Sequence, residues 1–160
     1  MKLSQLVFVL LAFVLISACS SKKEVVKAVE QKEQPEDQLA VHFIKNSTLT
    51  DVIEKAERDG KIVFMDLYTD WCLPCKLMVE DVYSDQDIGD FMNDNFVNYK
   101  VNAEKGNGPD LKFLYNIESY PGLLFLDTRG RVLEQKQGAA YHTELKEMAN
   151  RALDKVKTTY

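Results

Sequence analysis

Two cysteines separated by two residues are the part of the sequence with the clearest chemistry. Cys72 and Cys75 lie within residues 70–76, which read Asp-Trp-Cys-Leu-Pro-Cys-Lys. The apolar run 62–68 predicts a buried strand before them, and residues 77–82 can continue as a helix after them. At such a helix start, unpaired backbone N–H groups and the helix dipole favour a thiolate over a thiol. Because the thiolate is the species that attacks a disulfide, the pattern predicts redox chemistry.

Such a cysteine pair can also be half of a zinc site or two unrelated core thiols. A structural zinc ion takes four ligands. Beyond the pair, the chain offers only Cys19, His42 and His142, none of them at a ligand-like spacing. Pro74 suits a first helical turn, where a missing N–H costs nothing. We therefore expect no metal, and no cofactor other than a redox-active disulfide between Cys72 and Cys75.

Residues 1–18 have the composition of a secretory signal peptide. One lysine precedes an apolar run over 6–16, which is too short to span a bilayer as a permanent helix. The run ends in Ile-Ser-Ala-Cys, and this order resembles the bacterial lipobox, whose cysteine is lipidated. We expect Cys19 to carry a lipid and to begin the mature protein. An ordinary signal peptide and an uncleaved anchor are the alternatives.

The chain after the lipobox divides into a linker and one domain. Residues 19–38 contain no aromatic side chain and too little apolar surface to pack, which predicts a flexible tether. Residues 39–160 are long enough for a single domain. Cys72 and Cys75 are then its only cysteines. We expect the domain to be lipid-anchored to a bacterial membrane in the cell envelope, facing the periplasm, where a reduced pair must be actively maintained.

The charge balance limits the classes of partner. The formal net charge is −5 and no basic block or stripe occurs, which argues against nucleic acid. Nothing in the sequence suggests a nucleotide, flavin or haem site.

Hydrophobic periodicity predicts the elements that position the cysteines. Strands are expected at 40–44, 61–68, 96–101, 123–126 and 131–136, and helices from Ser47 or Thr50 to 58, from the cysteines to 82, from 84–87 onward, at 109–115 and at 143–155. Leu111, Leu114 and Tyr115 would form the apolar side of the helix at 109–115. Parallel β-α-β units followed by an antiparallel hairpin and a closing helix predict a mixed α/β sandwich.

This order of elements, together with the cysteine motif, resembles the thioredoxin family. Residues 66–72 and the Ser-Asp pair at 84–85 are similar to the C-terminal thioredoxin-like domain of DsbD and to small periplasmic lipoproteins of the family. The resemblance covers about residues 47–156. It implies the thioredoxin fold, with a central mixed β-sheet flanked by helices on both faces, and a thiol-disulfide oxidoreductase of the protein-disulfide reductase type.

The resemblance implies roles for residues around the motif. Cys72 would be the attacking thiolate and the more exposed thiol, while Cys75 would lie against the core and release the mixed disulfide. Tyr120 and Pro121 match the family's cis-proline loop, which offers backbone groups to the substrate chain, and only X–Pro bonds adopt cis at a tolerable cost. Trp71 would pack beside the dithiol. A trans proline in a turn and a core tryptophan are the alternatives.

Asp66 and Lys100 match two further positions of the family. Asp66 interrupts an apolar strand six residues before Cys72, and a buried carboxylate is costly unless it is paired. In the family this position holds a buried acid that handles the proton leaving the second cysteine, often accompanied by a lysine. The alternative is that Asp66 points to solvent and that Lys100 is a surface charge.

The residues between the cysteines bear on the direction of electron flow. In the family, Pro at the position of Pro74 is typical of reducing thioredoxins, whereas His there goes with strong oxidants. We therefore expect protein disulfides as substrates and a membrane thiol reductant as the electron donor. Two alternatives remain, a tethered client-binding or chaperone module and a copper-handling dithiol protein.

Overall fold

The computed structural model of the chain describes residues 39–159. The expected signal peptide at 1–18, the tether at 19–38 and the lipidation residue Cys19 therefore lie outside the described residues.

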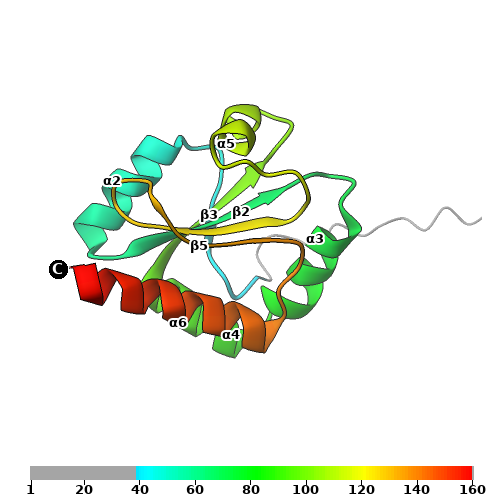
Figure 1. Cartoon of the computed structure of the whole chain (residues 1–160). Coiled ribbons are helices and arrows are strands. Elements are labelled where there is room, and N and C mark those ends of the chain that lie inside the picture. The colour runs from blue at the N-terminus through cyan, green and yellow to red at the C-terminus, as the bar shows by residue number, and fades with distance from the viewer. Residues whose placement is uncertain (1–38, 160) are drawn as a thin grey trace, which may run out of the picture. The chain divides into compact units, whose positions relative to one another are not determined.

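One mixed sheet forms the centre of the described region, with the spatial order β1-β3-β2-β4-β5 (Figure 1). Its strands are β1 (Phe43–Ile44), β2 (Ile62–Tyr68), β3 (Phe96–Asn102), β4 (Gly122–Leu126) and β5 (Val132–Gln137). The strands β1, β3 and β2 are parallel, and β4 and β5 each run antiparallel to the preceding neighbour in that order. This arrangement confirms the mixed α/β sandwich.

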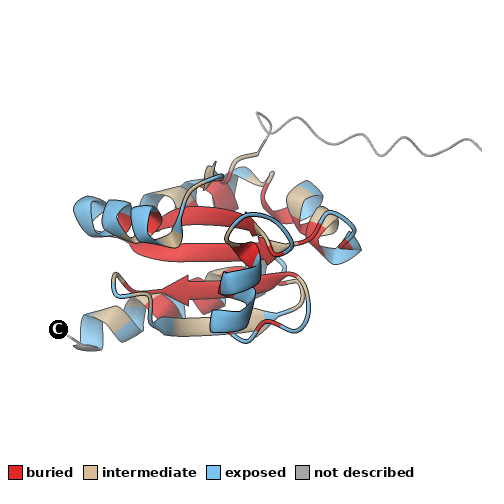
Figure 2. Ribbon diagram, turned by 90° about the horizontal axis from the view of Figure 1, so that it is seen from above, coloured by how far each residue is buried: buried red, intermediate tan, exposed pale blue. Residues whose placement is uncertain are grey.

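Helices cover both faces of the sheet. They are α2 (Leu49–Asp59), α3 (Leu73–Leu77) with the π-helical turn η3 (Met78–Val82), α4 (Gln86–Asn95), α5 (Gly108–Leu114) and α6 (His142–Thr159). One hydrophobic cluster joins the sheet to α2 and α5, and a second joins the opposite face to η3, α4 and α6. The strands β2, β3 and β4 are largely buried, whereas the edge strands β1 and β5 are only partly so and the outer sides of the helices are exposed (Figure 2).

The alternation of side chains along β2 explains why a polar residue can sit in its middle. Val63, Met65 and Leu67 join the cluster under α2 and α5, whereas Phe64 joins the opposite cluster. Asp66 has the same parity as Phe64, so it points to the face that carries η3, α4 and α6. A central strand is buried on both faces, and Asp66 is therefore buried with its apolar neighbours.

The helix α2 begins between the two residues proposed from the sequence. Thr48 is the N-cap residue and forms a capping box, in which Asp51 N–H donates to Thr48 Oγ1 while Thr48 N–H donates to the Asp51 carboxylate. These reciprocal bonds satisfy two donors at the helix start, which neither Ser47 nor Thr50 achieves here. Gly60 ends the helix with a φ of 64°, a left-handed conformation that glycine adopts without strain.

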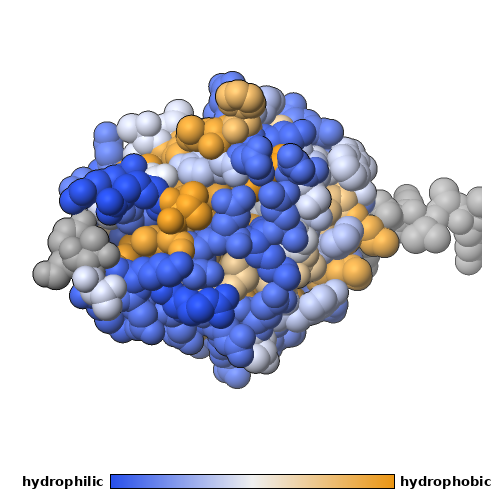
Figure 3. Space-filling view, viewed as in Figure 1, coloured by the Kyte–Doolittle hydropathy of each residue, from blue (hydrophilic) through white to orange (hydrophobic). Residues whose placement is uncertain are grey.

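The exposed side of α5 differs from the expectation. Leu111 and Tyr115 are buried, but Leu114 is 65% exposed and Phe113 is 91% exposed. Leu111 and Tyr115 are one turn apart and face the sheet, whereas Leu114 lies about 100° around the helix from Tyr115. Hydrophobic atoms accordingly gather over α5 at the top of the molecule in Figure 3.

The helix that follows the cysteines also differs from a single α-helix. After α3, the chain makes one π-helical turn, in which Tyr83 N–H donates to the Met78 carbonyl at 2.8 Å. The wider turn accommodates one extra residue. As a result, Val82 and Tyr83 are both buried at the end of η3.

Candidate active site

The cysteine pair forms a disulfide at the point where the chain passes from β2 into α3. The Sγ–Sγ distance is 2.00 Å. Cys72 is the N-cap residue of α3, and its Sγ accepts a hydrogen bond from the Cys75 backbone N–H at 3.1 Å. Pro74 occupies the first turn of the helix. A sulfur in this position is stabilised as a thiolate once the disulfide is reduced, because the Cys75 backbone N–H at the helix start points toward it.

The expectation that Cys72 is the more exposed cysteine is wrong for this oxidised pair. Each cysteine is 3% exposed. The residues on either side of Cys72 take up the solvent-facing surface instead, since Trp71 is 66% exposed and Leu73 is also largely exposed. The position of Cys72 at the helix tip therefore does not by itself expose its sulfur.

Asp66 and Lys100 are both buried and lie directly opposite each other on β2 and β3. Lys100 Nζ forms an ion pair and a hydrogen bond with Asp66 Oδ2. The alternative in which these residues are surface charges is therefore excluded by the structure. A buried ion pair of this kind is retained only where further interactions compensate for lost hydration.

Three aromatic rings provide such interactions for the ammonium of Lys100. Its Nζ lies 4.7 Å from the ring centroid of Tyr68, 5.1 Å from that of Tyr83 and 5.3 Å from that of Phe43. The electron-rich faces of the rings stabilise the cation. Lys100 and Tyr68 also line a cleft of about 580 Å³, so the Lys100 side of the buried pair borders a solvent-open space.

The loop before β4 lies beside the motif. The Tyr120–Pro121 peptide bond is cis. The ring of Tyr120 packs edge-on against that of Trp71, with centroids 5.8 Å apart. Trp71 is thus not a core residue, and the structure brings it together with Tyr120 next to the disulfide.

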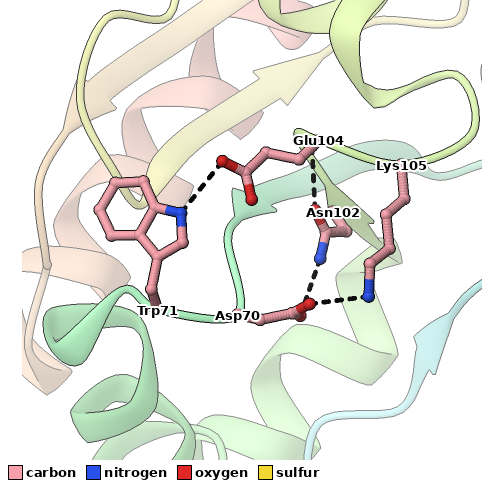
Figure 4. Close-up of polar contacts among 5 residues, drawn as sticks. All are labelled: Asp70, Trp71, Asn102, Glu104 and Lys105. Carbon is pink, nitrogen blue, oxygen red and sulfur yellow. Dashed lines mark hydrogen bonds and ion pairs between the residues drawn. The ribbon is translucent and has the colours of Figure 1, made fainter.

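Three residues at the end of β3 hold the motif in place and were not found from the sequence (Figure 4). Trp71 Nε1 donates to Glu104 Oε1 at 3.0 Å. Asp70 accepts from Asn102 Nδ2 at 2.8 Å and pairs with Lys105 Nζ at 2.7 Å. Their position after β3 could have revealed them, because β2 and β3 are parallel neighbours and their carboxyl ends meet at one edge of the sheet.

Neither a cluster of metal-ligating side chains nor a membrane-spanning helix occurs within residues 39–159. No group of three or more His, Cys, Asp or Glu side chains in this part of the chain is placed to hold a metal ion. No helix in the same range has the length and hydrophobicity needed to cross a membrane.

Replacing Glu104 with alanine should release Trp71 and slow the reaction of Cys72. Without its acceptor the indole is free to move, and a lost hydrogen bond of this kind corresponds to a rate about threefold lower. Trp71 is the only tryptophan of the chain, so the steady-state anisotropy of its fluorescence should fall in Glu104→Ala. The control is Glu147→Ala on the exposed side of α6. An unchanged anisotropy would show that Glu104 does not hold the ring.

Several solved structures have the same fold as this chain. A protein from Bacteroides thetaiotaomicron described as a "putative disulphide-isomerase" is 32% identical, with a TM-score of 0.65 over 72% of this chain and 94% of that chain. A thioredoxin from Thermus thermophilus has the same fold at 17% identity, with a TM-score of 0.63 over 72% of this chain and 88% of that chain. The fold and the Cys72–Cys75 disulfide define a thiol-disulfide oxidoreductase of the thioredoxin type.

The family follows from the sequence comparison. Residues 36–120 match the model of the Thioredox_DsbH family, described as a protein of unknown function, DUF255, and the chain belongs to this family. The thiol:disulfide interchange protein DsbD of Colwellia psychrerythraea is 30% identical over 96 residues, which make up 58% of this chain and 16% of that protein. The chain thus spans only a small part of the curated relatives that it matches.

Proposed function

We propose that this protein is a lipid-anchored reductant of disulfides in exported proteins, facing the periplasm of a bacterial cell envelope. The observation that carries the proposal is the Cys72–Cys75 disulfide at the start of α3, with Pro74 and no histidine between the cysteines. The similarity to DsbD proteins, which are named as thiol:disulfide interchange proteins, supports it. The anchor would be the lipid on Cys19, as the lipobox-like sequence predicts.

The reaction requires two successive thiol-disulfide exchanges. In the reduced protein, the Cys72 thiolate attacks a substrate disulfide, forms a mixed disulfide and releases one substrate thiolate. Cys75 then gives up its proton and attacks Cys72 Sγ, which releases the second substrate thiolate and closes the Cys72–Cys75 disulfide. Two electrons pass to the substrate, and a membrane thiol donor returns them to the protein. No cofactor other than the disulfide takes part.

Asp66 would accept the proton that leaves Cys75. A buried carboxylate can act as a base only if its ionised form is stabilised, and the ion pair with Lys100 provides this. The cleft lined by Lys100 would then let the proton reach solvent.

The substrate chain would bind over the exposed side chains around the disulfide. Trp71 and Tyr120 pack together there, and Pro121 follows in the same loop. Trp71 and Leu73 expose large apolar surfaces on either side of Cys72, which suits an unfolded or extended polypeptide better than a small charged disulfide.

The reduction potential of the Cys72–Cys75 pair tests the direction of the reaction. A Cys19→Ser variant leaves Cys72 and Cys75 as the only thiols. After equilibration in glutathione and dithiothreitol buffers, the potential should lie below about −220 mV, as for reducing thioredoxins. A value near −120 mV would make the protein an oxidant. If no disulfide forms at any buffer ratio, the redox function itself is wrong.

A further inference from the structure

Tyr83 is a buried, titratable residue to which the mechanism above assigns no role. It follows the π-helical turn η3, whose hydrogen bond from Tyr83 N–H to the Met78 carbonyl ends that turn. The side chain is completely buried, and its hydroxyl has no hydrogen-bond partner among the described residues. An unpaired buried hydroxyl is costly, and π-helical turns are frequent at functional sites.

The surroundings of Tyr83 contain an acceptor that is also unpaired. Lys100 Nζ lies 5.1 Å from the centroid of the Tyr83 ring and is bound to Asp66 Oδ2. Asp66 Oδ1 has no partner among the described residues. The ring of Phe43 packs edge-on against Tyr83 at 4.9 Å and restricts its plane. An unused donor and an unused acceptor therefore lie around one ammonium group.

The electrostatics keep the Tyr83 hydroxyl available as a donor. Burial, and after it the negative charge of Asp66, raise the pKa of Tyr83 well above its ordinary value. The phenol therefore keeps its proton throughout the pH range in which a dithiol works.

We propose that Tyr83 is a positioning residue for Asp66: its hydroxyl, which is unpaired in this oxidised structure, donates to Oδ1 of the ionised carboxylate in the reduced protein while Lys100 holds Oδ2. The inference rests on the proposed role of Asp66 as the acceptor of the Cys75 proton. A carboxylate has room for several donors, and each hydrogen bond to its charged form favours ionisation. Tyr83 thus supports the charged form of Asp66, which is the form that can accept a proton.

Few other groups can titrate near Asp66. Its own strand contributes Tyr68, and β3 contributes Lys100. The strand β4 places Leu123 opposite Asp66, and β1 contributes Phe43 beside Tyr83. From the η3 side come the apolar residues Met78 and Val82 of the same core cluster, and the dithiol itself lies at the start of α3. A change in the pH profile on loss of the Tyr83 hydroxyl therefore reports on Asp66 together with the dithiol, and Asp66→Asn identifies the contribution of Asp66.

The test uses the rate at which Cys75 closes the disulfide, measured against pH. Reduced protein carrying Cys19→Ser is mixed with excess dithiobis-nitrobenzoate, which reports one nitrothiobenzoate on attack by Cys72 and a second on closure by Cys75. The variant Tyr83→Phe removes only the hydroxyl. We expect the inflection of the second phase to move up by about one pH unit, because the charged Asp66 carboxylate loses a hydrogen-bond donor. Below the inflection, closure should slow by up to about tenfold.

Tyr99→Phe is the matched control. Tyr99 is equally buried, but its hydroxyl donates to the Ser47 carbonyl on the other face of the sheet. The control should lose stability and keep the wild-type pH profile. A Tyr83→Phe profile identical to wild type, with stability unchanged or increased, would overturn the inference, since this is the behaviour of a hydroxyl that is merely unpaired.

Asp66→Asn distinguishes the role of Asp66 from that of Tyr83. It should remove the inflection, and if it leaves the profile unchanged, the proton-accepting role of Asp66 fails. If it removes the inflection while Tyr83→Phe does not shift it, only the inference about Tyr83 fails. If Tyr83→Phe does not fold, the reduced wild-type protein can be labelled with carbon-13 at the phenolic carbon of Tyr83. The NMR chemical shift of this carbon is then measured against pH. Its chemical shift should change across the inflection of the closure rate, and a constant shift would contradict the proposal.

Discussion

Replacing Cys75 with serine should trap the protein on its substrate as a mixed disulfide with Cys72. The variant keeps the thiolate-stabilising position of Cys72 at the N-cap of α3, but it lacks the thiol that closes the ring and releases the substrate. Turnover should fall by at least about 1000-fold, because residues 39–160 contain no other thiol that could carry out the second exchange.

The trapped species can be identified by acid quenching, alkylation of free thiols and mass spectrometry of the conjugate. Cys72→Ser is the matched control and should trap nothing, although it differs from Cys75→Ser by only three positions. Accumulation of conjugates by Cys72→Ser instead would reverse the two roles. A tethered chaperone without turnover would keep its cellular function in Cys72→Ala, and such a result would replace the enzymatic interpretation.

Gly108→Ala should destabilise the fold by about 3 kcal/mol or more and loosen the site at the end of β3. A Cβ at Gly108 would lie 1.9 Å from the Asn102 carbonyl oxygen and 2.9 Å from Ala103 Cα. Both contacts are with backbone, so no side chain can rotate away. Since the Asn102 side chain bonds to Asp70, the displacement should reach the residues that precede the disulfide.

Gly106→Ala in the same loop gives the comparison. A Cβ at Gly106 meets nothing within 4 Å, but the φ of 56° is unfavourable for alanine and costs about 1 kcal/mol. The free energy of unfolding, measured with denaturant, should therefore be clearly lower for Gly108→Ala than for Gly106→Ala. The fluorescence emission of Trp71 should change only in Gly108→Ala. Equal stability of the two variants would mean that the contact with Asn102 relaxes at little cost.

The parts of the structure that follow from local patterns were predictable. The apolar run of β2, the helix start at 84–87 before α4 and the antiparallel hairpin of β4 and β5 each depend on neighbours in the chain. They therefore predicted the order of the elements and the mixed sheet. Asp66 stood out for a similar reason, because a lone carboxylate in an apolar strand must be paired if it is buried.

Other features arise where segments distant in sequence meet. Glu104 bonds to Trp71 only because the carboxyl ends of β2 and β3 lie side by side, and its own sequence neighbours carry no sign of this contact. The equal burial of Cys72 and Cys75 depends in the same way on the side chains around the helix tip.

The sequence by itself determined the class of this protein, because a Cys-x-x-Cys pair between a buried strand and a helix needs only local structure to become reactive. Tertiary structure alone decided what surrounds Asp66. The π-helical turn that buries Tyr83 has no distinctive residue pattern. Lys100 pairs with Asp66, 34 residues away in the sequence, only because the register of β2 and β3 places the two residues opposite each other. Side-chain chemistry was thus readable from the chain, whereas the contacts that tune it depend on packing.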